Sequence, residues 1–341
     1  MDLFAFTRAL IDIESVSDSE ERAGEFLFQH LSAMARSHGG TVERMAAAPR
    51  RFNVLACWGQ PRVTLSTHMD TVPPFFPARE DSEFIWGRGA CDAKGIIAAM
   101  IFAAGSLLAA GTRNFGLLFV VGEERSSIGA TVAAQNPRGS QFLINGEPTE
   151  NLLALGCKGA LRYEITAHGR LAHSAYPELG ESAIDKLLDV LRDIRAIPLK
   201  EDAVLGPGTL NIGTISGGRA PNVVADEARS EIMFRLVEDV EEIRRAISKA
   251  AGNRAEAREI LYTPMVRMGA LDGLPTSVVS FTTDIPAFAG AWGAPLLLGP
   301  GSIHVAHTAE ERISKKQLTE AVELYASLVK RLLAGERIAQ V

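Results

Sequence analysis

The chain has 341 residues, 47% hydrophobic and 22% charged, which is enough to bury a large core and favours two domains. Its net charge of −6 at pH 7 and its scattered Lys and Arg residues exclude the basic surface that nucleic-acid binding requires, so we expect no nucleic-acid partner. The N-terminus lacks the basic start and apolar run of a signal peptide, so we expect no export. The three cysteines, Cys57, Cys91 and Cys157, are odd in number and far apart, which suits a reducing compartment better than a set of disulfides. We therefore expect a cytoplasmic protein.

The first part of the chain is predicted to alternate between helices and short apolar strands. Its apolar run at 96–110 is rich in Ala and Gly and shorter than the roughly 20 residues that cross a membrane, so we place it in the core and expect no membrane partner. Such alternation is typical of a largely parallel sheet with helices on both faces, and the predicted fold class is α/β. The predicted helices are 3–13, 20–37 and 93–110, and the predicted strands are 53–58, 63–67, 115–121 and 142–145.

A different pattern occupies residues 158–262, where the predicted order is strand, helix, strand, strand, helix, strand. The helices are predicted at 182–197 and 240–251, and the two central strands around 210–215 and 228–236. After Thr263 the first pattern resumes and ends in a helix at 315–333. The predicted organisation is therefore a mixed, largely parallel α/β domain, 1–157 and 263–341, with a smaller α+β domain, 158–262, inserted into it.

Three predicted strands of the larger domain end in residues of the types that bind metals. They are His68 and Asp70 after 63–67, Glu123 and Glu124 after 115–121, and Glu147 after 142–145. Because ligands of open α/β sheets bind at the carboxyl ends of the strands, we expect these side chains to converge.

Two further side chains can reach the same edge of the sheet. Asp92 lies just before the helix at 93–110, and His307 lies in a late loop. Together with the strand-end residues they supply two imidazoles and at least three carboxylates, one of which can bridge two divalent ions about 3.5 to 4 Å apart. Nitrogen and oxygen ligands without thiolate favour zinc, with cobalt or manganese as alternatives.

Each of these residues can also be explained by a structural role that involves no metal site. A His-x-Asp at a strand end can be a surface pair, Glu123 and Glu124 can be solvated turn residues, and Glu147 before a proline can belong to a turn. Asp92 can be the N-cap of the helix that follows it. The coincidence of ligand types at all five strand-end and loop positions favours the metal site.

The segments that carry these residues resemble a known family. They are STHMDTVP at 66–73, GRGACDAKG at 87–95, EE at 123–124, GEPT at 146–149, and GPGS at 299–302 followed by AH at 306–307. In this order they resemble acetylornithine deacetylase and its relatives, the two-zinc metallopeptidases that include succinyl-diaminopimelate desuccinylase, aminoacylase and glutamate carboxypeptidase. The resemblance covers nearly the whole chain.

The resemblance implies a role for each residue of the site. Glu123 would be the general base that takes a proton from metal-activated water, and Asp70 would orient His68 through its second ring nitrogen. The implied ligands are His68, Asp92 and Glu147 for one zinc and Glu124, Asp92 and His307 for the other, with Asp92 bridging.

The inserted domain resembles the lid and dimerisation domain of the family, which implies a homodimer. His173 matches a lid histidine that reaches the partner subunit's site in dimeric relatives, although it can also be a surface histidine. Asn222 and Arg235 match lid residues that contact the substrate, where an Arg can bind a carboxylate bidentately. Arg235 can equally be a strand arginine paired with Glu231. His304 is expected to be a loop histidine and Cys91 a small buried residue.

The function that follows is hydrolysis of the amide bond of a small N-acyl amino acid, with a dipeptidase or carboxypeptidase of the same family as the alternative. Glu147 resembles the deacylases and carboxypeptidases of the family, whose aminopeptidases tend to place aspartate there. A non-catalytic metal-binding module would tolerate loss of Glu123 or His173, and both are present.

Overall fold

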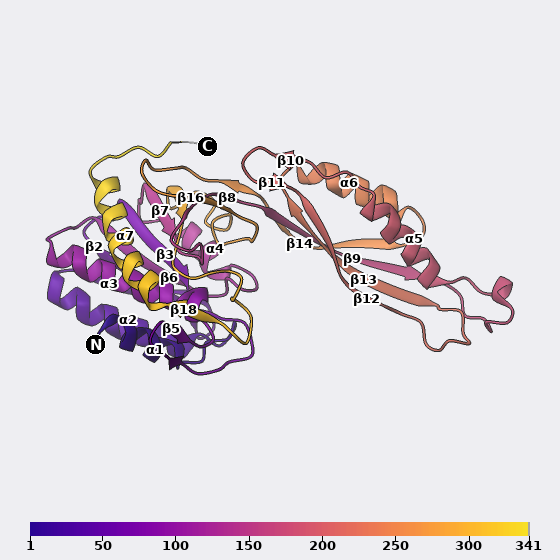
Figure 1. Cartoon of the computed structure of the whole chain (residues 1–341), viewed down its shortest axis with the longest axis horizontal. Helices are drawn as coiled ribbons and strands as arrows, with labels where there is room; N and C mark the ends of the chain where they lie inside the picture. The colour runs from indigo at the N-terminus through magenta and orange to yellow at the C-terminus, as the bar shows by residue number, and fades with distance from the viewer. Residues whose placement is uncertain (340–341) are drawn as a thin grey trace. The chain divides into compact units, whose positions relative to one another are not determined.

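The computed structural model describes residues 1–339 and divides the chain into two compact units (Figure 1). Unit 1 comprises Met1–Leu155, Arg267–Ser277 and Thr283–Val341. Unit 2 comprises Gly156–Val266 and Val278–Thr282, so it contains the predicted insert and takes in a short later segment as well.

The main sheet of unit 1 has the order β1-β2-β6-β3-β7-β17-β8-β15, with β16 paired to β8. The neighbours β6, β3, β7 and β17 run parallel, whereas β1, β2 and β8 join antiparallel. β3 and β6 are buried at every position, as expected for central parallel strands covered on both faces. The strands are β1 (Thr41–Ala48), β2 (Arg51–Trp58), β3 (Val63–His68), β6 (Phe115–Val120), β7 (Phe142–Asn145), β8 (Leu153–Cys157), β15 (Val266–Arg267), β16 (Thr276–Val279) and β17 (Ala294–Leu297).

Helices cover both faces of this sheet, which confirms the predicted α/β class. α1 (Leu3–Ile11), α2 (Glu21–His38), α3 (Gly95–Ala109) and α7 (Lys315–Leu333) share one hydrophobic core with one face, and α4 (Ile128–Gln135) packs on the other. Within the described residues the stretch Ala90–Ala109 is long and apolar enough to cross a membrane, and 83% of it is buried in the structure. Burial on all sides explains why α3 is apolar around its whole circumference.

A small second sheet in unit 1 joins two segments that are distant in sequence. β18 (Arg312–Ser314) pairs antiparallel with β5 (Phe84–Trp86), which pairs with β4 (Arg79–Glu80). This pairing holds the segment after His307 against the segment before Asp92.

Unit 2 is a four-stranded antiparallel sheet of order β12-β13-β9-β14 with two helices packed on one face (Figure 1). Alternate residues of β13 are buried, so its inner face meets the helices. The predicted element order is observed, with an additional short hairpin, β10 (Glu201–Asp202) and β11 (Gly206–Pro207). The main elements are β9 (Gly159–His168), α5 (Ala183–Arg195), β12 (Thr209–Gly217), β13 (Glu227–Leu236), α6 (Val240–Ala251) and β14 (Glu256–Thr263).

Candidate metal centre and active site

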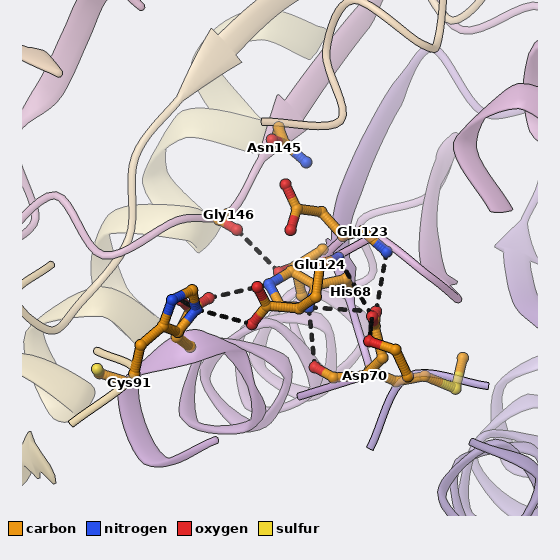
Figure 2. Close-up of polar contacts among 12 residues, drawn as sticks. His68, Asp70, Cys91, Glu123, Glu124, Asn145 and Gly146 are labelled. Atoms are coloured by element: carbon orange, nitrogen blue, oxygen red, sulfur yellow. Dashed lines mark hydrogen bonds and ion pairs between the residues drawn. The ribbon is translucent and has the colours of Figure 1, made fainter. Parts of the chain in front are cut away.

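The candidate residues of unit 1 gather at the carboxyl ends of three adjacent parallel strands. His68 is the last residue of β3, Glu123 and Glu124 follow β6, and Glu147 follows β7. Because the sheet order is β6-β3-β7, these strand ends lie side by side. Figure 2 shows His68, Asp70, Glu123 and Glu124 in this cluster.

Two histidines meet one carboxylate at the centre of the cluster. His68 Nε2 lies 3.0 Å from Asp92 Oδ1, and His307 Nε2 lies 3.2 Å from Asp92 Oδ2. His307 Nε2 also lies 3.0 Å from Glu124 Oε1. One ligand atom each from His68, Asp92 and Glu124 lies within 4.8 Å of the other two. Asp92 therefore offers one oxygen to each histidine, as a carboxylate shared by two cations must.

Asp92 is not an N-cap of the following helix. It lies in an irregular turn, Ala90–Lys94, where Asp92 and Ala93 depart from helical dihedral angles, and Lys94 precedes the first residue of α3. Burial raises the pKa of Asp92, but the hydrogen bonds to His307 and His68 lower it by more, so the carboxyl is ionised. The turn directs this carboxylate toward the two histidines.

The charges of the cluster fit a divalent cation. Burial lowers the pKa of His68, but Asp70 and Asp92 raise it well above its usual value. Hydrogen bonds to Asp92 and Glu124 raise the pKa of His307 to about 10. The imidazoles are thus protonated where a metal ion would replace the protons. Glu147 adds a buried oxygen, Oε1, that has no hydrogen-bond partner among the described residues.

The adjacent acids Glu123 and Glu124 have different surroundings. Glu124 binds His307, whereas Figure 2 shows no dashed line from the Glu123 carboxylate. Burial raises the pKa of both carboxyl groups, and the charges of Glu147 and Asp284 add to the effect at Glu123. A carboxyl group with a raised pKa and no fixed partner is suited to proton transfer.

Asp70 holds the turn that carries these two acids. Its Oδ1 accepts hydrogen bonds from the backbone N–H groups of Gly122 and Glu123 at 2.9 and 3.0 Å, and its Oδ2 accepts one from Glu124 at 3.2 Å (Figure 2). Nδ1 of His68 lies 3.0 Å from the main-chain oxygen of Asp70 and 3.5 Å from its Oδ1. Asp70 thus contacts His68 as predicted, mainly through its carbonyl, while its carboxylate positions the strand end of β6.

Three buried charged residues near the cluster were not predicted. Both carboxylate oxygens of Asp284 are buried without a hydrogen-bond partner in the described part of the chain, and burial raises the pKa of this carboxyl group to about 7. Glu311 pairs with Arg88 in the interior, and burial raises the pKa of Glu311 to about 7 as well. Asp284 and Glu311 are single acids in loops, and no spacing or strand end marks them in the sequence.

In unit 2 the structure brings His173 and Asn222 together. His173 pairs with Val223, and the N–H of Ser174 donates to the main-chain oxygen of Asn222 at 3.0 Å. The N–H of Ala175 donates to His173 Nδ1 at 3.1 Å, so the neutral imidazole carries its hydrogen on Nε2. The ring is exposed and can donate this hydrogen to a ligand.

Arg235 lies at the opposite end of the same sheet from this pair. It sits near the end of β13, opposite Ala160 and Thr209, about 26 Å along the strand from Glu227. Its side chain is half-buried and has no hydrogen bond or ion pair among the described residues, and burial lowers its pKa. The alternative in which Arg235 pairs with Glu231 is not observed, because Glu231 binds Arg162.

His304 and Cys91 were expected to be a loop histidine and a small buried residue. His304 is exposed on its loop. Cys91 is buried against Gly301, where a Cβ would lie 2.6 Å from the Cβ of Cys91.

Comparison with known proteins places this architecture in a family. The sequence matches the model described as peptidase family M20/M25/M40 over residues 64–331. A peptidase M20 domain-containing protein of Schizosaccharomyces pombe is 39% identical, covering 96% of this chain and 84% of the relative. A probable carboxypeptidase of Aspergillus terreus is 37% identical, covering 95% of this chain and 85% of the relative. The crystal structure of a tripeptidase from Staphylococcus aureus has the same fold, with a TM-score of 0.81 at 22% identity over 96% of this chain and 98% of that one.

These names favour the predicted alternative, a peptidase, over the N-acyl amino acid hydrolase that the sequence predicted first. The family implies metal ions, and the cluster around Asp92 brings together side chains of the types that could hold one. The chain belongs to the peptidase family M20/M25/M40 and is a metal-dependent hydrolase.

Proposed function

We propose that the protein is a two-zinc carboxypeptidase that releases the C-terminal residue of a small peptide. The observation that carries the choice of reaction is the half-buried Arg235, which has no ion-pair partner within residues 1–339, together with relatives of 36–39% identity that are named probable carboxypeptidases or M20 peptidases. Arg235 would bind the free carboxylate of the substrate bidentately, which offsets the cost of its partial burial.

The ligands would be shared between two ions. His68, Asp92 and Glu147 would hold one, and Glu124, Asp92 and His307 the other. When bound, the ions would lower the pKa of water and polarise the scissile carbonyl. The donor set of imidazole and carboxylate groups suits zinc, with cobalt or manganese as alternatives.

Glu123 would be the general base. Its carboxyl has a raised pKa and, unlike Glu124, no histidine hydrogen-bonded to it among the residues that the structure describes. It would accept the proton of the attacking water and deliver it to the leaving amine. The Asp70 carboxylate supports this by fixing the backbone of Glu123 through a 3.0 Å hydrogen bond.

His173 and Asn222 would act on the substrate from a second copy of the chain. Within one copy of unit 2, Asn222 precedes β13 and Arg235 lies near its end, a separation along the strand of about 26 Å. One small substrate cannot contact both ends, so a site that uses His173, Asn222 and Arg235 takes them from two subunits. Nε2–H of His173 would then stabilise the oxyanion of the tetrahedral intermediate.

The surface of unit 2 supports a homodimer. Ile184 and Leu188 lie one turn apart on α5 with 36% and 52% of their area exposed, and Ile215 on β12 is 56% exposed. β12 is an edge strand of the sheet, so its outer backbone groups are open to pairing with a second copy.

A substrate panel tests the reaction. A carboxypeptidase should cleave N-acetyl-Ala-Ala to N-acetyl-Ala and Ala, and should reject the same peptide with a C-terminal amide. An N-acyl amino acid hydrolase should instead prefer N-acetyl-Ala, which presents the same amide and carboxylate without a second residue. An aminopeptidase should cleave free Ala-Ala-amide and reject both N-acetyl compounds. Cleavage of the amidated peptide as fast as the peptide with a free C-terminal carboxylate would overturn the proposal.

A further inference from the structure

A buried ion pair in unit 1 ties together two segments that carry candidate metal ligands. Arg88 Nη1 lies 2.5 Å from Glu311 Oε2, and the two side chains are only 2% and 0% exposed. Arg88 precedes Asp92 by four residues, and Glu311 follows His307 by four. The pair therefore joins the turn of Asp92 to the loop of His307.

The other oxygen of Glu311 reaches the main chain of Asp92 itself. The N–H of Asp92 donates to Glu311 Oε1 at 3.3 Å. Asp92 and Ala93 depart from helical dihedral angles, so α3 does not impose the conformation of this turn. A side chain from the segment of His307 thus contacts the backbone that aims the Asp92 carboxylate.

The carboxylate of Glu311 is itself held firmly. The N–H of Gly87 donates to the main-chain oxygen of Glu311 at 3.1 Å, and the next residue, Arg312, pairs with Trp86 in the small sheet. Lys94 is fully buried nearby, donates to the oxygen of Ile13 at 2.6 Å, and interacts with the charge of Glu311. The carboxyl group of Glu311 therefore lies between Arg88 and the backbone of Asp92 in the interior and has little freedom to move.

We propose that Glu311, anchored by Arg88, is a positioning residue for the metal centre, because it fixes Asp92 relative to His307. The inference rests on the proposed ligand roles of Asp92 and His307. The ion pair between Arg88 and Glu311 would thereby keep His307 Nε2 at its distance of 3.2 Å from Asp92 Oδ2. Loss of partners that orient metal ligands typically weakens metal binding by about 10 to 100 fold.

Cobalt binding tests the proposal apart from catalysis. Metal-free protein is titrated with Co²⁺, and affinity is measured by competition with a chelator while the visible absorbance reports ligand geometry. Glu311→Ala should weaken binding by about 10 to 100 fold and change the spectrum. Glu311→Gln keeps an acceptor oxygen without the charge, so this variant should lose less cobalt affinity than Glu311→Ala.

Two variants separate positioning from loss of stability. The double variant Arg88→Met with Glu311→Leu replaces the buried pair by apolar side chains, which usually preserves folding, but it leaves the N–H of Asp92 without its acceptor. It should keep a Tm near that of the wild type and still bind cobalt weakly. Leu107→Ala, buried toward the other end of α3, should lower the Tm and leave cobalt affinity unchanged.

Each outcome decides one claim. Wild-type cobalt affinity and spectrum in the folded double variant would overturn the positioning role, as would an equal loss of affinity in Leu107→Ala. If Glu311→Ala does not fold, the double variant carries the test. Asp92→Asn is measured alongside. Normal cobalt binding by Asp92→Asn would refute the proposed metal site itself. Loss of cobalt binding by Asp92→Asn, together with normal binding by the double variant, would refute the positioning role alone.

Discussion

Replacing Asp284 by Asn is expected to stabilise the metal-free protein increasingly as the pH rises from 5 to 8. Burial raises the pKa of this carboxyl from 3.8 to about 7, so between these values the folded protein keeps a proton that the unfolded chain releases. Stability is therefore lost as the pH rises through this range. The full loss above the folded pKa is about 4 kcal/mol, of which about 3 kcal/mol develops between pH 5 and pH 8.

Asn has no charge to bury, so the difference between variant and wild type should grow by about 3 kcal/mol over this interval. Urea unfolding at several pH values, with the metal chelated, measures this difference, and its change with pH is independent of any constant cost of burying the amide. Asp272→Asn, at an exposed position, is the control and should show no such growth. Adding Zn²⁺ should reduce the difference, because a nearby cation stabilises the ionised carboxyl of the wild type. A difference that stays flat between pH 5 and 8 would refute the reasoning.

Chelation should remove the metal and abolish peptide hydrolysis, and added Zn²⁺ or Co²⁺ should restore it; full activity in metal-free protein would contradict the central proposal. Glu123→Gln should lower kcat by about 100 to 10,000 fold with metal content near normal, whereas Glu124→Gln should lose metal, so equal metal loss by elemental analysis would reverse the two assignments. Mixing His173→Ala with Glu123→Gln subunits should restore activity at one of the two sites of each heterodimer, and no recovery in verified heterodimers would exclude a role in trans. Arg235→Met should weaken cleavage of N-acetyl-Ala-Ala by at least about 10 fold, with partial retention in Arg235→Lys; an unchanged kcat/KM would remove Arg235 from substrate binding.

Much of unit 1 could be predicted because its strands are continuous apolar runs and its helices have clear ends. The convergence of His68, Glu124 and Glu147 followed from one rule about the carboxyl ends of parallel strands. β1 was not predicted, because half of its residues are exposed and they lack strict alternation. Pairing with β2 makes it a strand, and that contact is not visible in its own sequence.

The buried acids around the candidate metal ligands could not be predicted, for a different reason. Asp284 and Glu311 matter because loops distant in sequence bury them, and nothing local distinguishes them from solvated acids. The spacing between Asn222 and Arg235 likewise did not show that β13 separates them, since a strand and a compact turn can span the same number of residues. The sequence could show that His307 can reach the site, but only the resemblance gave its role, because a loop has no periodicity that predicts where its side chains return.

The interruption of unit 1 by unit 2 determines the order in which the metal centre can be completed during synthesis. Asp92, Glu124 and Glu147 leave the ribosome before unit 2, whereas His307 leaves it afterwards. β17, the parallel partner of β7, also comes late, so the nascent sheet carries an open edge until it arrives. Most of unit 2, by contrast, comes from one continuous stretch, so its main strands and helices are all made before the last part of unit 1. Under the proposed ligand assignment, a growing chain cannot present all the ligands until His307 has been made, so we expect tight metal binding only in chains that already contain this late segment.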